Sequence, residues 1–202
     1  MNVKPTHALP AMNRHAPVVV VMLLGWLVTS VPVFAQDDVS AEVSAGYLNV
    51  SGSMHGWSVQ ASKLFAPNWA LVGEVAGARG RDCVDCDPAF NDVAVLGGIR
   101  YTWPGRPRVS PSWQLLAGVL HSVAQGYYAD PLFGGSPYFI EGYTVNYLAI
   151  QPGVGLTFMV TPRVGISTQA DLQLAIPDQT EYEGVTAFPR VTIGAVLQFG
   201  TR

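Results

Sequence analysis

Apolar and polar residues alternate along residues 163–177, close to the end of the chain. Every second residue of this stretch is mostly apolar, and the residues between them are mostly polar or glycine. The apolar set is Val164, Ile166, Thr168, Ala170, Leu172, Leu174 and Ile176. A period of two residues places alternate side chains on opposite faces of a β-strand, so this stretch predicts a strand with one apolar and one polar face.

Similar segments, separated by turn signals, fill the chain after residue 36. We place eight strands near residues 39–50, 57–65, 70–79, 92–103, 112–125, 143–160, 163–175 and 188–200. Most hold about ten residues or more, which is long for soluble proteins but suits strands that cross a membrane at a tilt. Short connections alternate with long ones, as in outer-membrane barrels. The prediction is an all-β fold, an eight-stranded antiparallel transmembrane β-barrel, closed because an open sheet edge cannot be satisfied in lipid.

The two faces of such strands have different surroundings. In a membrane barrel the apolar faces look at lipid and the polar faces look inward. The composition agrees, because only 12% of the residues are charged, against about a quarter in soluble domains. Aromatic residues gather at the strand ends that short turns join, where an interfacial girdle is expected. They are Phe65, Trp69, Tyr101, Trp103, Trp113, Phe158 and Phe199.

The N-terminal region has the features of a secretory signal peptide. Lys4 and Arg14 precede the apolar run VVVVMLLGWLVTSV, and small residues stand in position for cleavage before Gln36. The run is shorter than the roughly 20 residues of a spanning helix, which argues against a retained membrane anchor. We therefore predict a leader over residues 1–35 and one barrel domain over residues 36–202.

From about residue 39 to its end, the chain resembles the small outer-membrane β-barrel family of the OmpA transmembrane domain, OmpX and Ail type. The resemblance rests on the strand pattern, the alternating connections and the aromatic girdle rather than on an invariant motif. It implies eight antiparallel strands, an interior filled by side chains and a function carried by surface loops. It also implies a place in the bacterial outer membrane, in contact with its lipid and lipopolysaccharide.

Charged residues on the predicted inward faces need partners in a narrow, poorly hydrated interior. They are Glu42, Glu74, Arg100, Asp171 and Arg190. Glu74 and Arg100 lie equally far from the middle of their connecting loop, so we expect them to face each other. Asp171 and Arg190 are near-opposed on the last hairpin, and Glu42 joins them if the first strand closes on the last. The set predicts an ion network that plugs the barrel. A proton or ion path is the alternative, although eight strands leave little lumen.

Two cysteines, Cys83 and Cys86, stand on a predicted external loop in RGRDCVDCDPAFND. In an exported protein they predict a local disulfide. Zinc would need two more ligands, which are absent at suitable spacing, and a thioredoxin-like motif would need a βαβ context. The aspartates of this loop could hold a hard cation such as calcium, but the glycine and terminal glutamate of an EF-hand loop are missing. We expect no metal and no cofactor.

The long loop at residues 125–143, QGYYADPLFGGSPYFIEGY, is dense in aromatic residues. We expect a contact surface formed by Tyr127, Tyr128, Phe133, Tyr138 and Phe139. The alternative is that these rings fold onto the barrel rim at the level of the lipid headgroups. The flanking strands are also the longest, so the hairpin could project above the membrane as a sheet edge available for pairing.

Together these features predict a monomeric, surface-exposed structural or interaction protein, adhesion-like, whose long loops meet a protein ligand. A narrow passive channel for small solutes is one alternative, and a lipid-modifying enzyme that uses His121 and Ser122 is another. Adjacent strand residues point to opposite faces, so these two cannot cooperate, and we predict no catalytic activity. Nucleic acid is not an expected partner, because the total charge is −3 and loss of the basic leader makes it about −5.

Overall fold

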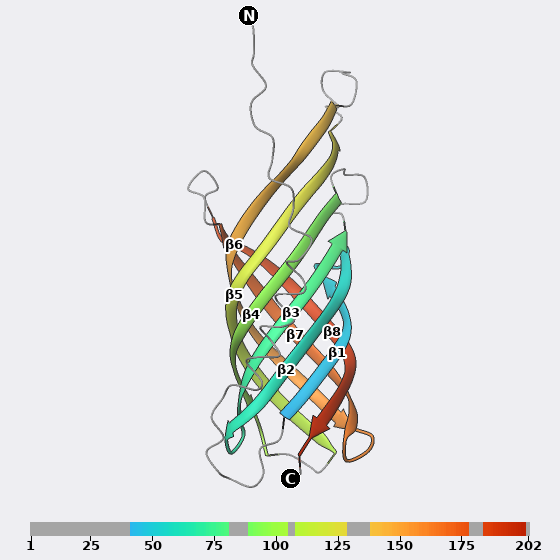
Figure 1. The fold of residues 1–202 in the computed structure, drawn as a ribbon, viewed down its shortest axis with the longest axis vertical. Helices are drawn as coiled ribbons and strands as arrows, with labels where there is room; N and C mark the ends of the chain where they lie inside the picture. The colour runs from blue at the N-terminus through green and yellow to red at the C-terminus, as the bar shows by residue number, and fades with distance from the viewer. Residues whose placement is uncertain (1–40, 81–88, 105–107, 129–137, 178–183, 201–202) are drawn as a thin grey trace, which may run out of the picture. The chain divides into compact units, whose positions relative to one another are not determined.

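The computed structural model describes residues 41–80, 89–104, 108–128, 138–177 and 184–200. They form the strands β1 (Ala41–Val50), β2 (Met54–Ala66), β3 (Trp69–Gly80), β4 (Ala89–Thr102), β5 (Val109–Tyr128), β6 (Tyr138–Met159), β7 (Val164–Pro177) and β8 (Thr186–Phe199). Each strand pairs antiparallel with its neighbour in the sequence, and β1 pairs with β8 to close the barrel (Figure 1). The predicted eight-stranded antiparallel barrel is confirmed.

The alternation along each strand separates the outer wall from the interior. On β7, Val164, Ile166 and Leu172 are 42%, 49% and 43% exposed. The two polar residues on either side of Leu172, Asp171 and Gln173, are buried. Exposed side chains of that size on a closed barrel are stable only where lipid replaces water. The apolar face of the strand therefore looks at the membrane, as expected.

Tight turns join the strands at one end of the barrel, and residues that tolerate positive φ appear in them. Asn68, between β2 and β3, has φ +70°, a left-handed conformation that asparagine adopts more readily than most residues. Between β6 and β7 the Thr161 hydroxyl accepts a hydrogen bond from the Val164 backbone at 3.0 Å. At the opposite end of the barrel, the turn between β1 and β2 is also tight, with Ser51 and Gly52 at φ +52° and +79°. Because this turn is so short, β2 begins at Met54, earlier than the pattern predicted.

Part of the predicted aromatic girdle is a set of rings in contact at the short-turn end. Trp69 meets Tyr101 and Trp113 edge-on, with centroids 5.1 and 5.6 Å apart. Tyr101 meets Trp103 in the same manner at 5.5 Å. Edge-on aromatic pairs are favourable, and tryptophan and tyrosine prefer the membrane interface. The clustering of these four rings confirms that part of the prediction and marks one boundary of the apolar band.

The interior divides into an apolar half and a polar layer. An apolar cluster lies toward the end with the longer loops, and it includes Leu48, Val50, Met54, Val72, Ala76, Ala94, Leu96, Leu116, Leu120, Ala149 and Ala175. The polar layer lies next to it and is described below. Within the described ranges, no helix is long and apolar enough to cross a membrane. The predicted leader, residues 1–35, lies outside the described residues.

Candidate functional site: a polar network inside the barrel

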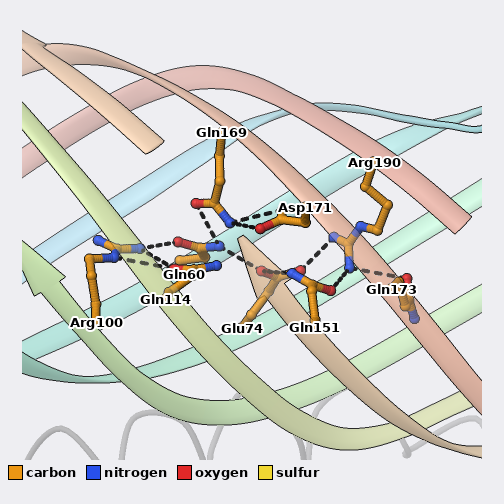
Figure 2. A network of polar contacts seen from close by, with 9 residues as sticks. All are labelled: Gln60, Glu74, Arg100, Gln114, Gln151, Gln169, Asp171, Gln173 and Arg190. Atoms are coloured by element: carbon orange, nitrogen blue, oxygen red, sulfur yellow. Dashed lines mark hydrogen bonds and ion pairs between the residues drawn. The ribbon is translucent and has the colours of Figure 1, made fainter. Parts of the chain in front are cut away.

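Two ion pairs anchor the polar layer. Arg190 on β8 donates from Nη2 to Oε1 of Glu74 on β3 at 2.5 Å, and the two side chains are 1% and 0% exposed (Figure 2). Arg100 on β4 donates from Nη1 to Oε1 of Glu42 on β1 at 2.9 Å. Both pairs join strands that are not neighbours in the sheet, so they cross the lumen. Each therefore ties opposite walls of the barrel together.

These pairs differ from those predicted for the same residues. Glu74 does not face Arg100, because the β3–β4 register places Glu74 opposite Leu96 and Arg100 opposite Ala70. The prediction was wrong because the centre of that hairpin lies nearer to β3 than the middle of the loop suggested. Glu42 does not join Arg190 either. Its second oxygen accepts from Gln198 on β8 at 3.1 Å, so its contacts stay near the short-turn end.

Glutamines connect the two ion pairs into one network. Gln60 on β2 accepts from Arg100 through Oε1 and donates through Nε2 to Glu74 Oε2 at 2.5 Å. Gln151 on β6 accepts from Arg190 Nη1 and lies 3.4 Å from Glu74 Oε2 through Nε2. Gln114 likewise accepts from Arg100, at 3.1 and 3.2 Å. A glutamine amide both donates and accepts, so each one can bridge a guanidinium and a carboxylate.

The predicted ion network consisted of charges and lacked these amides. The sequence did contain a signal for these amides. Once one residue of a strand is assigned to the inward face, the alternation gives all the other inward positions of that strand. On β2 the inward set that includes Gln60 also holds Ser58 and Ser62, and all three are buried. Of these three, Gln60 bridges Arg100 and Glu74, so a glutamine at an inward position of a strand was the signal for a bridging residue.

The backbone of Asp171 lies where the sequence predicted, but its side chain makes different contacts. It is the register partner of Arg190 on the last hairpin. Its carboxylate, however, accepts two hydrogen bonds from Gln169 Nε2, at 2.7 and 2.9 Å. The side chain extends over Gly153 of β6, where an added Cβ would lie 1.8 Å from Asp171 Oδ1. The glycine therefore provides the space that the carboxylate occupies.

This arrangement is suited to cross-linking and filling rather than to chemistry. Its carboxylates receive hydrogen bonds from fixed amides and guanidinium groups, which lowers the cost of their burial. The fully buried large side chains include both Arg190 and Glu74 of the network and Leu48 and Leu116 of the apolar cluster. The ion pair and the apolar cluster thus follow one another along the lumen, and the side chains of both fill it.

The residues of the enzymatic alternative remain apart. His121 Nδ1 lies 2.8 Å from Asn146 Oδ1 of the neighbouring strand. Ser122 is the register partner of Asp92 and Val145, both of which line the inward face. As successive residues of one strand, the histidine and the serine point to opposite sides of the wall. No groups of three or more metal-ligating side chains occur among the described residues.

Other predicted sites fall partly or wholly outside the described residues. Cys83 and Cys86 lie there, as does Phe133, so the disulfide stays a prediction. Labelling of both cysteines by a thiol reagent without prior reduction would contradict it. The remaining loop aromatics belong to β5 and β6, where the backbone of Tyr127 pairs with Phe139 and that of Tyr128 with Tyr138.

Comparison with known proteins gives matches in structure alone. No protein-family model matches the chain, and no curated protein sequence matches it. A solved structure of Ail, the attachment invasion locus protein of Yersinia pestis, in complex with the heparin analogue sucrose octasulfate, superposes with a TM-score of 0.52 at 20% identity, over 80% of this chain and 99% of that one. This chain has the fold of the small outer-membrane β-barrels.

Two further barrels support the same assignment. Neisserial surface protein A matches with a TM-score of 0.55 at 14% identity, over 80% of this chain and 97% of that one. A major outer membrane protein from Thermus thermophilus matches with a TM-score of 0.55 at 14% identity, over 80% and 99%. At such identities the shared property is the eight-stranded barrel, and the loops and the interior network have to be judged on their own residues.

Proposed function

We propose that this protein resides in the bacterial outer membrane and acts at the cell surface as a structural or interaction protein. The observation that carries the proposal is the length of one hairpin. β5 and β6 hold 20 and 22 residues, whereas the other strands hold between 10 and 14. A membrane needs only about 9–11 residues of a tilted strand. The surplus residues of this hairpin therefore extend beyond the lipid.

One edge of the projecting hairpin offers backbone groups for pairing. The ladder between β6 and β7 begins at Tyr147 paired with Pro177. Among the described residues, positions 138–146 of β6 pair only with β5. Figure 1 shows β5 and β6 rising past the ends of the other strands. An extended segment of another protein could add to such an edge through main-chain hydrogen bonds, and the loop aromatics would supply side-chain contacts.

The identity of a ligand is constrained by charge. The long loops are rich in acids, including Asp82, Asp85 and Asp87. A sulfated ligand such as the one crystallised with Ail is disfavoured here by repulsion. A neutral or basic protein surface is the better candidate.

A passive channel is the less favoured function, and the filled interior is the reason. Conduction would require a path past the buried Glu74–Arg190 pair and the apolar cluster beside it. Eight strands leave an interior that side chains can fill completely. We expect only background conductance from the protein in planar bilayers, and a steady conductance would favour the channel instead. A catalytic role has no supporting cluster of groups among the described residues.

The hairpin can be tested by shortening it. In the shortened chain, Asn-Gly replaces residues 125–142. This two-residue turn, which suits hairpins, connects Ala124 to its register partner Tyr143. The barrel is retained, because the ladder to β4 ends at Gln125 and that to β7 begins at Tyr147. Cells that express the shortened chain should lose adhesion to cultured cells or to each other, compared with cells that express the full chain.

Two controls make this result interpretable. Outer-membrane fractionation and the heat-dependent gel mobility of the barrel should be the same for both chains. Equal adhesion by the full and the shortened chain would refute the role of the hairpin. Recovery of the protein in the soluble periplasmic fraction would refute its placement in the membrane.

A further inference from the structure

A group of hydrogen-bonding side chains lies on the outer wall of the barrel, at the strand ends opposite the aromatic girdle. Asn49, His55 and Arg79 occupy positions near the loop-facing ends of β1, β2 and β3. They are register partners in succession, since Asn49 pairs with His55 and His55 pairs with Arg79. Cross-strand partners on one face have Cβ atoms about 4.5–5.5 Å apart, so these side chains form one surface.

The hydrogen bonds of Asn49 determine which nitrogen of His55 carries its proton. The Asn49 Oδ1 accepts from the backbone N–H of Gly52 at 3.1 Å, which leaves its Nδ2 to donate to His55 Nδ1 at 3.1 Å. The Tyr47 hydroxyl also contacts His55 Nδ1. With Nδ1 acting as an acceptor, the proton of a neutral imidazole must be on Nε2. His55 thus presents an N–H donor away from these partners, and its ring is exposed.

Arg79 adds an exposed cation beside that donor. It forms no ion pair with any other residue that the structure describes. Carboxylates with described side chains, which are Glu42, Glu74, Asp92 and Asp171, all occupy inward positions. Among the residues with described side chains, no acid on the outer wall lies beside Arg79 to neutralise it.

Large aromatic residues place this surface at a membrane interface. Tyr47 and Trp57 are register partners directly below the group and are 50% and 51% exposed. The Tyr47 ring stacks on His55 with centroids 5.9 Å apart. The Trp57 indole covers Gly77, where an added Cβ would lie 3.0 Å from the ring. Exposed tyrosine and tryptophan mark the depth of lipid headgroups in membrane proteins, so His55 and Arg79 lie at that depth or just outside it.

We propose that His55 and Arg79 bind the phosphate group of a phosphorylated glycolipid in the outer leaflet, with Asn49 and Tyr47 positioning the imidazole. A phosphate oxygen accepts hydrogen bonds from a guanidinium and from an imidazole N–H, and the bonds are strengthened by its charge. The phosphate belongs to a lipid and not to a soluble anion, because the donors lie on the wall that faces the membrane. The inference rests on the proposed placement of the barrel in the outer membrane.

The test compares variants of the full chain refolded in phosphatidylcholine vesicles. Arg79→Gln removes the cation, and His55→Phe removes the N–H donor while keeping a ring to stack on Tyr47. Arg163→Gln is the matched control, because Arg163 is an exposed arginine in the turn between β6 and β7, at the other end of the barrel. Each chain is titrated with diphosphorylated lipid A, with the same glycolipid after dephosphorylation, and with inorganic phosphate. The readout is the shift of the urea unfolding midpoint.

Lipid A should raise the midpoint of the unchanged chain and of Arg163→Gln. The apparent affinity should fall about tenfold for Arg79→Gln and for His55→Phe, as expected for the loss of one charge-assisted hydrogen bond. Equal responses of all variants, or an equal response to the dephosphorylated glycolipid, would overturn the site. Reproduction of the full shift by inorganic phosphate would overturn its assignment to a lipid. The chain with the shortened β5–β6 hairpin should respond normally, so failure of the surface role and failure of this site give different results.

Discussion

The ion pair between Glu74 and Arg190 allows a quantitative test of how the interior is held together. We consider Glu74→Gln, Arg190→Gln and their combination, together with Asp171→Asn. Both members of the pair are almost completely inaccessible, at 0% and 1% exposure. Removing one of them leaves the other charge buried with amide neighbours alone. For a buried pair this change costs about 3–5 kcal/mol.

The double variant and Asp171→Asn should behave differently from the single changes. Removing both charges leaves a neutral glutamine network, so the combined loss should be smaller than the sum by about 1–3 kcal/mol. Asp171 receives its hydrogen bonds from Gln169 Nε2 on both carboxylate oxygens, and asparagine can still accept one of them through its amide oxygen. We expect Asp171→Asn to cost about 1 kcal/mol, the difference between a charged and a neutral hydrogen bond.

The measurement is urea unfolding of the full chain in lipid vesicles, followed by tryptophan fluorescence. Double-mutant cycles should be measured for Arg190 with Glu74 and for Arg190 with Asp171. Strong coupling is expected in the first cycle and weak coupling in the second. Equal coupling in both cycles would mean that Arg190 is coupled to its register neighbour Asp171 as strongly as to Glu74 across the lumen, which would contradict the pairing described above. Additive losses for Glu74 and Arg190 would show that the ion pair does not stabilise the barrel.

Three further predictions concern other parts of the chain. Ile166→Arg on the lipid face should lower the free energy of unfolding by up to about 2–4 kcal/mol, and Val160→Arg, beside the turn, should lower it less. Equal losses for the two variants in vesicle unfolding would contradict the assignment of the apolar band. Gly153→Ala should destabilise by about 1–3 kcal/mol through overpacking, because the added methyl meets a carboxylate oxygen at 1.8 Å, whereas Gly97→Ala, with its nearest contact at 3.8 Å, should be neutral or stabilising by urea unfolding. The mature protein should begin at Gln36 on N-terminal sequencing, and isolation of the exported chain with its leader intact would contradict this.

The alternation of residues was sufficient to predict the strands and their faces. On β7 the exposed Val164, Ile166 and Leu172 and the buried Asp171 follow directly from a period of two. That pattern depends only on local backbone geometry, and the surroundings of each face follow from its polarity. The number of strands and their order needed no more than the turn signals and the requirement for a closed sheet.

The partners of the interior charges could not be predicted in the same way. Glu74 and Arg190 belong to strands that are not adjacent, so their contact depends on the stagger of the strands and the diameter of the barrel. Neither quantity is encoded in a local pattern. An error of a few residues at the centre of the β3–β4 hairpin was enough to pair Glu74 with the wrong arginine. The faces of charged residues were therefore predictable, whereas their contacts required the complete register.

The pairing of β1 with β8 has a consequence for how the chain is made. Ala41 in β1 pairs with Phe199 in β8, so the ladder that closes the barrel cannot form until β8 has been synthesised and delivered. Until then two strand edges are open, and lipid offers them no hydrogen bonds. Such an intermediate is also prone to aggregation through those edges. Frameshifts within β8 or before it should consequently prevent formation of the closed barrel, and production of the protein in cells should depend on factors that shield unfinished sheets.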